Sequence, residues 1–371
     1  MLTPFSLTAP MVKGEGAPPL LASAIMDNES VGINHANVTA WMREHVGAVA
    51  PLSFELIAGG RSNLTYRVTD ALGHSYALRR PPASHVLPTA HDMVREHTII
   101  SALYPIGIPV AKPLGICIDE TVNERPFYIM EFVEGAILRN RSQAEAAFDL
   151  ATRRTIGDNL AATLARLHDV DIEEAGLTNL SRHDGYIERQ LRRWRTQYEQ
   201  MSVQGVDDDG IVGSVGDQLA ASIPAQQRVS IVHGDYRLDN AVLDEQGRVK
   251  AILDWEICTL GDPMADLGLL LCYWAEPSDT SEVLLGVSPT TAPGFCTRDQ
   301  VLAAYASHTT LDVSHVAYYQ AFGYWKLACV LQGVYARYSA GATAGDQGSV
   351  ADFPEHIAML AETARQTLER R

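Results

Sequence analysis

The stretch from Ile231 to Trp255 reads IVHGDYRLDNAVLDEQGRVKAILDW, and its order of apolar and polar residues decides how the rest of the chain is interpreted. A short apolar run leads into a His-Gly pair that is followed at once by Asp235. Asn240 comes five residues later, and Asp254 closes a second apolar run. Two predicted strands therefore deliver two carboxylates and one amide to their ends.

An Asp, an Asn five residues later and an Asp at the end of the next strand are what Mg²⁺-dependent phosphoryl transfer onto a hydroxyl requires. Asp235 would orient or deprotonate the hydroxyl. Asn240 and Asp254 would hold Mg²⁺ against the nucleotide phosphates. Turn chemistry explains the DEQG sequence at 244–247, but it does not explain three polar residues that each adjoin apolar runs. The stretch therefore predicts a small-molecule kinase.

The sequences HGDYRLDN at 233–240, LDWE at 253–256 and GDPMADL at 261–267 resemble the aminoglycoside phosphotransferase and choline kinase family. Gly234 stands where protein kinases usually have Arg or Lys, and Trp255-Glu256 stand where they have Phe-Gly, which favours the small-molecule branch. The resemblance extends from about Ala40 to the C-terminus. It implies an α+β, protein-kinase-like fold with a small antiparallel-sheet N-lobe and a larger, mainly helical C-lobe.

Residues 52–80 read as three strands, with a glycine-containing turn at 58–63 and a second turn at 72–74. A glycine loop between antiparallel strands lets backbone N–H groups approach phosphate oxygens. We expect Gly60, Ser62 and Asn63 to bind the phosphates in this way, and an ordinary hairpin is the alternative. Neither a Walker A sequence nor G-x-G-x-x-G occurs in the chain, which argues against P-loop and Rossmann folds.

In kinase-like folds the third strand presents a cation to the phosphates, paired with a Glu on the next helix. Arg79 occupies that position, with arginine in place of lysine, as in the branch that resembles the phosphotransferase domains fused to acyl-CoA dehydrogenases. Alternation along the strand predicts that Arg79 points toward the nucleotide and Arg80 points outward. Glu96, in a predicted helix at 93–103, is the expected partner of Arg79.

The apolar strand at 127–133 leads into EFVEG at 131–135, which resembles the hinge between the lobes. The backbone at Glu131 and Val133 is expected to bind the adenine, and a buried strand end is the alternative. Backbone recognition leaves little trace in a sequence, so ATP and GTP are not distinguished.

Three regions are expected along the chain. Residues 1–35 would form a flexible N-terminal tail. The N-lobe, at 36–133, would carry the phosphate loop, the strand arginine, the helix glutamate and the hinge. The helical C-lobe, at 134–371, would carry the catalytic loop, the metal site and the acceptor pocket, with nucleotide and metal between the lobes.

Two groups of residues in the predicted C-lobe have further roles. His233 belongs to the catalytic set, where we expect it to secure the loop by hydrogen bonding rather than to transfer protons. The family resemblance implies that Asp266 braces the catalytic loop. A predicted helix at 185–201 carries Arg189, Arg192 and Arg193 on one face. That face is either solvated and salt-bridged or a subsite for an anionic part of the acceptor.

Composition narrows the class of protein. The formal net charge of −16 argues against a nucleic-acid partner. The longest apolar run, 267–275, is too short for a bilayer, and no signal segment opens the chain, so we expect no membrane association and a cytoplasmic location. Five cysteines without a C-x-x-C pair fit reduced, mostly buried thiols. The oligomeric state is not indicated.

These features together predict an ATP- and Mg²⁺-dependent phosphotransferase that moves the γ-phosphoryl group to a hydroxyl of a small molecule. The branch resemblance and the arginine helix favour a hydroxyacyl thioester as acceptor, whereas the net charge favours a cationic aminoglycoside. A choline- or sugar-type kinase of the same fold is an alternative. A catalytically weak nucleotide-binding pseudokinase is another, because Arg79 departs from lysine. A metal-dependent hydrolase would need a His-rich ligand set.

Overall fold

The computed structural model describes residues 32–58, 63–82, 92–201, 203, 206, 210–279, 288–340 and 352–370. The chain folds as two units. Unit 1 contains Met1–Val94 and Leu114–Phe132, and unit 2 contains Arg95–Pro113 and Val133–Arg371. The functional boundaries drawn from the sequence at residues 35 and 133 remain predictions.

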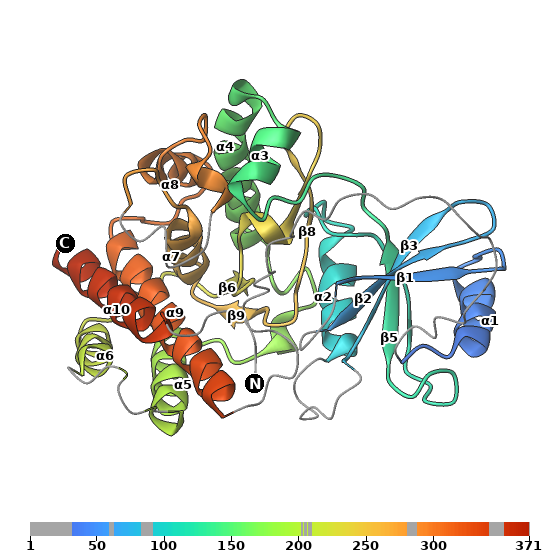
Figure 1. Ribbon diagram of the computed structural model, residues 1–371, viewed down its shortest axis with the longest axis horizontal. Coiled ribbons are helices and arrows are strands. Elements are labelled where there is room, and N and C mark those ends of the chain that lie inside the picture. Colours follow the sequence, from blue (N-terminus) through green and yellow to red (C-terminus); the bar gives the residue numbers. More distant parts are fainter. Residues whose placement is uncertain are drawn as a thin grey trace, which may run out of the picture. The chain divides into compact units, whose positions relative to one another are not determined.

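Unit 1 is built on a five-stranded sheet with the order β1-β2-β3-β5-β4 (Figure 1). Its elements are α1 (His35–His45), β1 (Ser53–Ala58), β2 (Leu64–Thr69), β3 (Ser75–Arg80), β4 (Pro113–Cys117) and β5 (Phe127–Glu131). The three strands expected at 52–80 are confirmed. β3 pairs antiparallel with both β2 and β5, so that Leu78 lies opposite Tyr66 on one side and Ile129 on the other.

The core of unit 1 lies between helix α1 and one face of the sheet. The side chain of Asn34 caps α1 by accepting a hydrogen bond from the backbone N–H of Asn37 at 3.1 Å. Val38 and Met42 on the helix are fully buried and join Leu78 and its strand neighbours in one hydrophobic cluster. Alternation along the strands supplies that cluster with every second residue.

Arg80 differs from the sequence prediction. It does lie on the opposite face of β3 from Arg79, but it is only 1% exposed. Its Nε donates to the carbonyl of Pro81 at 3.1 Å, and a Cβ at Gly32 would meet the Arg80 Nη1 at 2.0 Å. The outward orientation was wrong because residues distant in sequence cover this face of the sheet.

Unit 2 contains most of the helices, and its helices and short strands have the following bounds. The α-helices are α2 (Met93–Leu103, of which Met93 and Val94 belong to unit 1), α3 (Arg141–Ala147), α4 (Leu150–His168), α5 (Tyr186–Gln200), α6 (Ile211–Ala221), α7 (Met264–Tyr273), α8 (Arg298–Ser307), α9 (Val316–Ser339) and α10 (Phe353–Glu369). The 3₁₀ turns are η1 (Thr178–Leu180), η2 (Leu238–Asn240) and η3 (Pro289–Thr291). Two strand pairs accompany them: β6 (Ser230–Val232) with β9 (Thr259–Gly261), and β7 (Ala241–Leu243) with β8 (Val249–Ile252).

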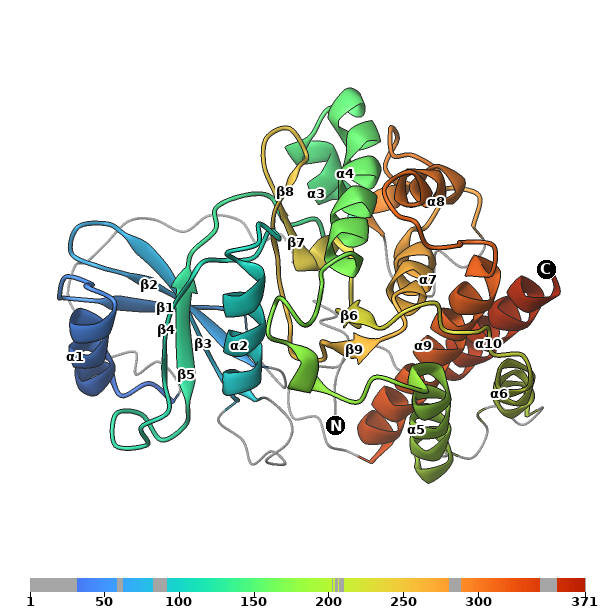
Figure 2. The same cartoon turned by 180° about the vertical axis from the view of Figure 1, so that it is seen from behind.

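Helix α9 is the central helix of unit 2, and α7, α5 and α10 pack against it (Figure 2). A Cβ at Gly268 of α7 would meet the backbone of Tyr319 at 2.4 Å, so the two helices touch backbone to backbone only because residue 268 is glycine. Phe322 and Trp325 of α9 are buried in this packing. The aromatic stretch of α9 therefore serves mainly as core.

Two expectations drawn from the composition, buried thiols and no membrane-spanning segment, can be compared with the structure. All five cysteines lie in described positions, and each is a buried free thiol. Across the described ranges, none of the helices combines the length and the apolar character needed to cross a membrane.

Candidate active site

The loop between β6 and η2 is fixed by one buried carboxylate on α7. Asp266 accepts hydrogen bonds from the backbone N–H of His233, at 2.6 Å, and from that of Gly234, at 2.8 Å. Burial alone would raise the pKa of Asp266, but the hydrogen bond and the charge of His168, with these further contacts, lower it. Asp266 therefore stays ionised and braces the loop from below, as the sequence resemblance implied. Gly234 has a φ of 86°, which favours glycine.

His233 uses both ring nitrogens inside the same loop. Its Nε2–H donates to the carbonyl of Leu253 at 2.9 Å, and its Nδ1 accepts from the backbone N–H of Asp235 at 3.3 Å. The ring also makes an edge contact with Trp255, with 4.7 Å between ring centroids. This geometry joins the loop to the strand end that carries Asp254, which is the securing role expected for His233.

Asn240 connects the two carboxylates of the motif. Its Nδ2 donates both to the Oδ2 of Asp235 and to the backbone carbonyl of Asp235, each at 2.9 Å. Its own backbone carbonyl accepts from the N–H of Leu253 at 2.7 Å, one residue before Asp254. The structure therefore brings Asp235, Asn240 and the strand end at Asp254 together within unit 2.

The electrostatic surroundings of Asp235 suit a proton acceptor. Burial raises the pKa of its carboxyl. The positive charge of Arg237 opposes this rise, whereas the carboxylates of Asp239 and Asp254 add to it. A carboxylate whose pKa lies above its ordinary value is a better general base near neutral pH, provided that it remains ionised.

Asn240 and Asp254 fit the oxygen ligands that Mg²⁺ prefers. The Nδ2 of Asn240 is committed to Asp235, which leaves its Oδ1 as the acceptor atom. Asp254 has a φ of 64°, a conformation that is costly for a residue with a side chain and that is concentrated at functional sites. Within the described residues, no group of three or more His, Cys, Asp or Glu is arranged to hold a metal. The His-rich set that a hydrolase would need is therefore missing from that part of the chain.

The residues expected to bind the nucleotide fall in both units. In unit 1, Arg79 donates from Nη1 to the Oγ1 of Thr65 at 3.4 Å, Asn63 is buried just before β2, and Glu131 ends β5. Glu96 is a buried residue of α2. Glu96 and Val133 both belong to unit 2. The pairing of Arg79 with Glu96 and the adenine contacts remain predictions, and Gly60 and Ser62 lie outside the described residues.

Lys326 of α9 is a site residue that the sequence did not single out. Its Nζ donates to the carbonyl of Gly234 at 3.2 Å and lies 5.7 Å from the indole ring of Trp194. Burial lowers the pKa of Lys326, and the charges of Asp235 and Asp266 act in the opposite direction. Gly234, the residue before Asp235, therefore has a carboxylate at its N–H and a cation at its carbonyl. The available sequence signal was a lysine in the middle of an apolar, aromatic helix whose other cation, Arg337, lies in its last turn.

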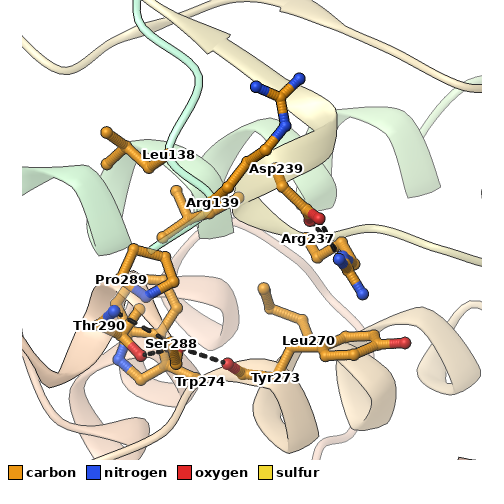
Figure 3. Close-up of a pocket in the computed structure, with 11 residues that line it drawn as sticks. Leu138, Arg139, Arg237, Asp239, Leu270, Tyr273, Trp274, Ser288, Pro289 and Thr290 are labelled. Atoms are coloured by element: carbon orange, nitrogen blue, oxygen red, sulfur yellow. Dashed lines mark hydrogen bonds and ion pairs between the residues drawn. The ribbon is translucent and has the colours of Figure 1, made fainter. Parts of the chain in front are cut away.

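Arg237 lies two residues after Asp235, within the motif itself. Its guanidinium pairs with the carboxylate of Asp239 and lies over the ring of Tyr273, with 4.4 Å between Cζ and the ring centroid. The sequence RLD at 237–239 could have indicated the pair of Arg237 and Asp239. It could not have indicated that Tyr273 of α7 lies against this pair (Figure 3).

Three arginines of α5 have local partners. Arg189 donates to the carbonyl of Arg182 at 3.2 Å, and Arg193 lies 5.2 Å from the ring of Trp194. Arg195 pairs with Glu199 and Asp217. An anion-binding role for Arg189, Arg192 and Arg193 remains a prediction.

Comparison with known proteins matches residues 53–288 to the profile of the phosphotransferase enzyme family. Mouse (Mus musculus) acyl-CoA dehydrogenase family member 11 is 31% identical over 343 residues, which cover 90% of this chain and 43% of that protein. The mouse family member 10 is 31% identical over 319 residues, 84% of this chain and 29% of that protein. The chain therefore spans less than half the length of these curated relatives.

Two solved structures extend the comparison. A Ralstonia eutropha protein, provisionally named an aminoglycoside phosphotransferase, is 31% identical with a TM-score of 0.76, covering 90% of this chain and 98% of that one. A choline kinase from Cryptosporidium parvum has a TM-score of 0.59 at 16% identity, covering 90% of this chain and 95% of that one. The second likeness shows the fold alone, and it agrees with the α+β, kinase-like fold expected from the sequence.

Proposed function

This chain belongs to the phosphotransferase enzyme family, and we propose that it transfers the γ-phosphoryl group of ATP to a hydroxyl group of a small molecule. The observation that carries the proposal is the bond from the Asn240 amide to the Asp235 carboxylate, at 2.9 Å. It holds the proposed base beside the proposed metal ligand, with Asp254 close enough for its charge to act on Asp235.

The proposed reaction follows from the positions of these groups. The acceptor hydroxyl would bind to the carboxylate of Asp235, which takes its proton as the oxygen attacks the γ-phosphorus. A bond forms between that oxygen and phosphorus, and the bond from phosphorus to the bridging oxygen of ADP breaks, so that ADP leaves with the electron pair. Asp266 and Lys326 hold the peptide that carries Asp235.

Asn240 and Asp254 are the proposed Mg²⁺ ligands, and a bound Mg²⁺ would neutralise charge on the phosphate oxygens. Arg79 is proposed to bind the phosphates, with Glu96 orienting it. An arginine keeps the charge of the usual lysine and can bind two oxygens at once. Gly60, Ser62 and Asn63 are proposed to contribute the phosphate loop, and Glu131 and Val133 the adenine contacts.

For the acceptor, we propose a hydroxyacyl thioester. The support comes from the relatives whose name is acyl-CoA dehydrogenase and which share most of this chain at about 30% identity. We expect a domain that accompanies an enzyme of acyl-CoA chemistry to act on the same class of compound. An aminoglycoside or choline acceptor, as named for the solved relatives, is the competing proposal.

The test is a screen for ADP release and phosphorylated product with hydroxyacyl-CoA, aminoglycoside, choline and sugar acceptors. Each acceptor is tried with ATP and with GTP, with and without Mg²⁺, and with Asp235→Asn as the inactive control. We expect product only with Mg²⁺ and a nucleotide, and fastest with a hydroxyacyl-CoA. Tight nucleotide binding without product from any acceptor class would instead support the pseudokinase alternative.

A further inference from the structure

The turn at 255–258 directly follows Asp254 and lies against the catalytic loop. A backbone hydrogen bond of 3.2 Å joins its last residue to its first. A Cβ at Gly234 would meet the Cγ1 and Cδ1 of Ile257 at 3.0 Å, so the Ile257 side chain packs directly on the residue before Asp235. A displacement of this turn would therefore act on Asp254 along the chain and on Asp235 through the packing.

Helix α2 reaches this turn through Arg95, near the start of the helix. The Arg95 guanidinium donates from Nη2 to the backbone carbonyl of Cys258, the last residue of the turn, across 163 residues of sequence. Cys258 is fully buried, and Arg95 is half-buried. A charged donor makes a stronger hydrogen bond than a neutral one, and exclusion of water strengthens it further. The bond therefore fixes the turn to α2.

Electrostatics support the closeness of α2 to the turn. Burial raises the pKa of the Cys258 thiol. The charge of Arg95 opposes this rise, whereas the charge of Glu96 adds to it. Both residues of the helix therefore lie near enough to the turn for their charges to act on it, and Glu96 is the residue proposed to orient the phosphate-binding arginine.

The other end of α2 is fixed independently of Arg95. The segment that follows the helix forms a parallel bridge to β8, between Val110 and Ile252. In addition, Arg166 of α4 donates from Nη2 to the carbonyl of Gly107 at 2.6 Å. Loss of the Arg95 bond would therefore release the turn from the start of α2 while the end of the helix stays bound to β8 and α4.

The backbone of Asp254 needs support from its surroundings. Its φ of 64° is costly for a residue with a side chain, and such a conformation persists only where neighbouring contacts enforce it. On the side before Asp254, the carbonyl of Leu253 accepts from the His233 ring at 2.9 Å. On the side after it, the bond from Arg95 holds the carbonyl of Cys258. The proposed metal ligand thus lies between two fixed points.

We propose that Arg95 is a positioning residue for phosphoryl transfer, whose bond to the Cys258 carbonyl keeps Asp254 in the orientation that binds Mg²⁺. The inference rests on the proposed function and adds to it a residue that acts through the backbone of the turn. It also gives α2 a second task beside carrying Glu96, because the same helix then positions the metal ligand.

The kinetic test compares the wild type with Arg95→Gln, Arg95→Lys and Arg166→Gln. Arg166 is the matched control, because it too donates from a guanidinium to a backbone carbonyl of unit 2, at the opposite end of α2. For each protein, kcat and the Mg²⁺ concentration that gives half-maximal rate are measured with the fastest acceptor.

We expect Arg95→Gln to raise the half-maximal Mg²⁺ concentration by about 10–100-fold, the usual cost of losing a group that supports a metal ligand. Arg95→Lys should recover part of this loss, because it keeps a charged donor, and Arg166→Gln should leave the Mg²⁺ dependence unchanged. An unchanged Mg²⁺ dependence in Arg95→Gln, or an equal change in Arg166→Gln, would overturn the inference.

Hydrogen–deuterium exchange without nucleotide separates this inference from the proposed reaction. In Arg95→Gln the amides at 255–259 should exchange about tenfold faster or more, the loss of one charged hydrogen bond, while those of the β7–β8 turn at 244–248 serve as the unchanged reference. A thermal melt confirms that the variant is folded. If it is not, the smaller change expected in Arg95→Lys becomes the test.

The two measurements together distinguish the possible failures. Faster exchange at 255–259 in a chain that phosphorylates none of the acceptors would leave the role of Arg95 in holding the turn and would refute the proposed reaction. A wild type that forms product, with exchange and Mg²⁺ dependence both unaltered in Arg95→Gln, would refute the role of Arg95 and leave the proposed reaction.

Discussion

The side-chain amide of Asn240 donates to Asp235 twice, once to the carboxylate and once to the backbone carbonyl, at 2.9 Å each. Both donor hydrogens are therefore used on one residue. The amide oxygen is the side-chain atom left to act as the proposed Mg²⁺ ligand. One side chain is thus proposed both to orient the base and to offer an oxygen to Mg²⁺.

Asn240→Ala should therefore damage two properties together. The Mg²⁺ concentration needed for half-maximal rate should rise by about 10–100-fold, the usual cost of disturbing a metal site. The kcat at saturating Mg²⁺ should also fall, because Asp235 loses its orienting bond. Asn159→Ala is the control, since Asn159 bonds the carbonyl of Gly247 at 3.0 Å, away from the motif. A variant that loses kcat with an unchanged Mg²⁺ dependence would remove Asn240 from the metal site.

Lys326→Met should lower kcat by about 10–100-fold while leaving the affinity for ATP unchanged, because small displacements of a catalytic group are costly. The bond from Lys326 to the Gly234 carbonyl positions the next residue, Asp235, rather than the nucleotide. Lys326→Arg should recover part of the rate, since it still offers a donor. Steady-state kinetics of both variants and of Lys112→Met, an exposed lysine, make the comparison. An equal loss in the Met and Arg variants would point to packing alone.

Alanine substitutions at Arg79 and Arg80 should affect different properties, KM for ATP in the first case and stability in the second. Arg79→Ala should raise KM for ATP and leave stability nearly unchanged. Arg80→Ala should destabilise the protein by about 2 kcal/mol by leaving a cavity beside Gly32, with no effect on KM.

Arg80→Met is the control for Arg80→Ala, because methionine fills the space of the aliphatic part of the arginine side chain. It removes only the buried guanidinium, whose Nη1 has no hydrogen-bond partner among the described residues. It should cost less than the alanine variant. Urea unfolding and ATP kinetics on all three variants test both statements. A larger KM effect from Arg80 than from Arg79 would contradict the assignment of faces on β3.

Asp70 should make unit 1 sensitive to acid. Burial alone would raise the pKa of its carboxyl, but backbone N–H groups of His74, Val49 and Leu72, with the His74 ring, lower it to about 2 from an ordinary 3.8. Because the folded pKa is the lower one, the stabilisation is present above about pH 4 and is lost as the pH falls toward 2.

Asp70→Asn removes that titration. Its destabilisation, measured by urea unfolding, should be largest at pH 5 and should shrink steadily toward pH 2. Asp158→Asn, at an exposed position of α4, should show no such trend. A difference between wild type and Asp70→Asn that stays constant with pH would show that Asp70 acts through its shape and not through its charge.

The sequence was most informative where chemistry and local pattern coincide. The order of Asp235, Asn240 and Asp254 between apolar runs predicted the loop, because each residue lies near the end of a strand whose pattern is visible over a few positions, and the family resemblance implied the fold. The family resemblance then implied the role of Asp266, which lies on the next helix and bonds the loop as expected.

What the sequence did not indicate depends on contacts between distant segments. Arg80 is buried because α1 and Gly32 cover its face of the sheet, and alternation along one strand does not reveal what covers either face. Lys326 lies 92 residues from Gly234 in the chain, so no local spacing connects them. The segment before α3 lies beside β7 because Ala136 pairs with Leu243, a single bridge between non-neighbouring segments.

The central claim, that Asp235 is the group that receives the acceptor proton, is tested most directly by measuring kcat and the Kd for Mg²⁺-ATP in the wild type and in Asp235→Asn. With the fastest acceptor found in the screen, kcat should fall by about 10²–10⁴-fold, the usual contribution of a positioned base, while the Kd stays within about twofold. A variant that keeps most of its turnover, or that loses turnover only because it no longer binds Mg²⁺-ATP, would contradict the claim.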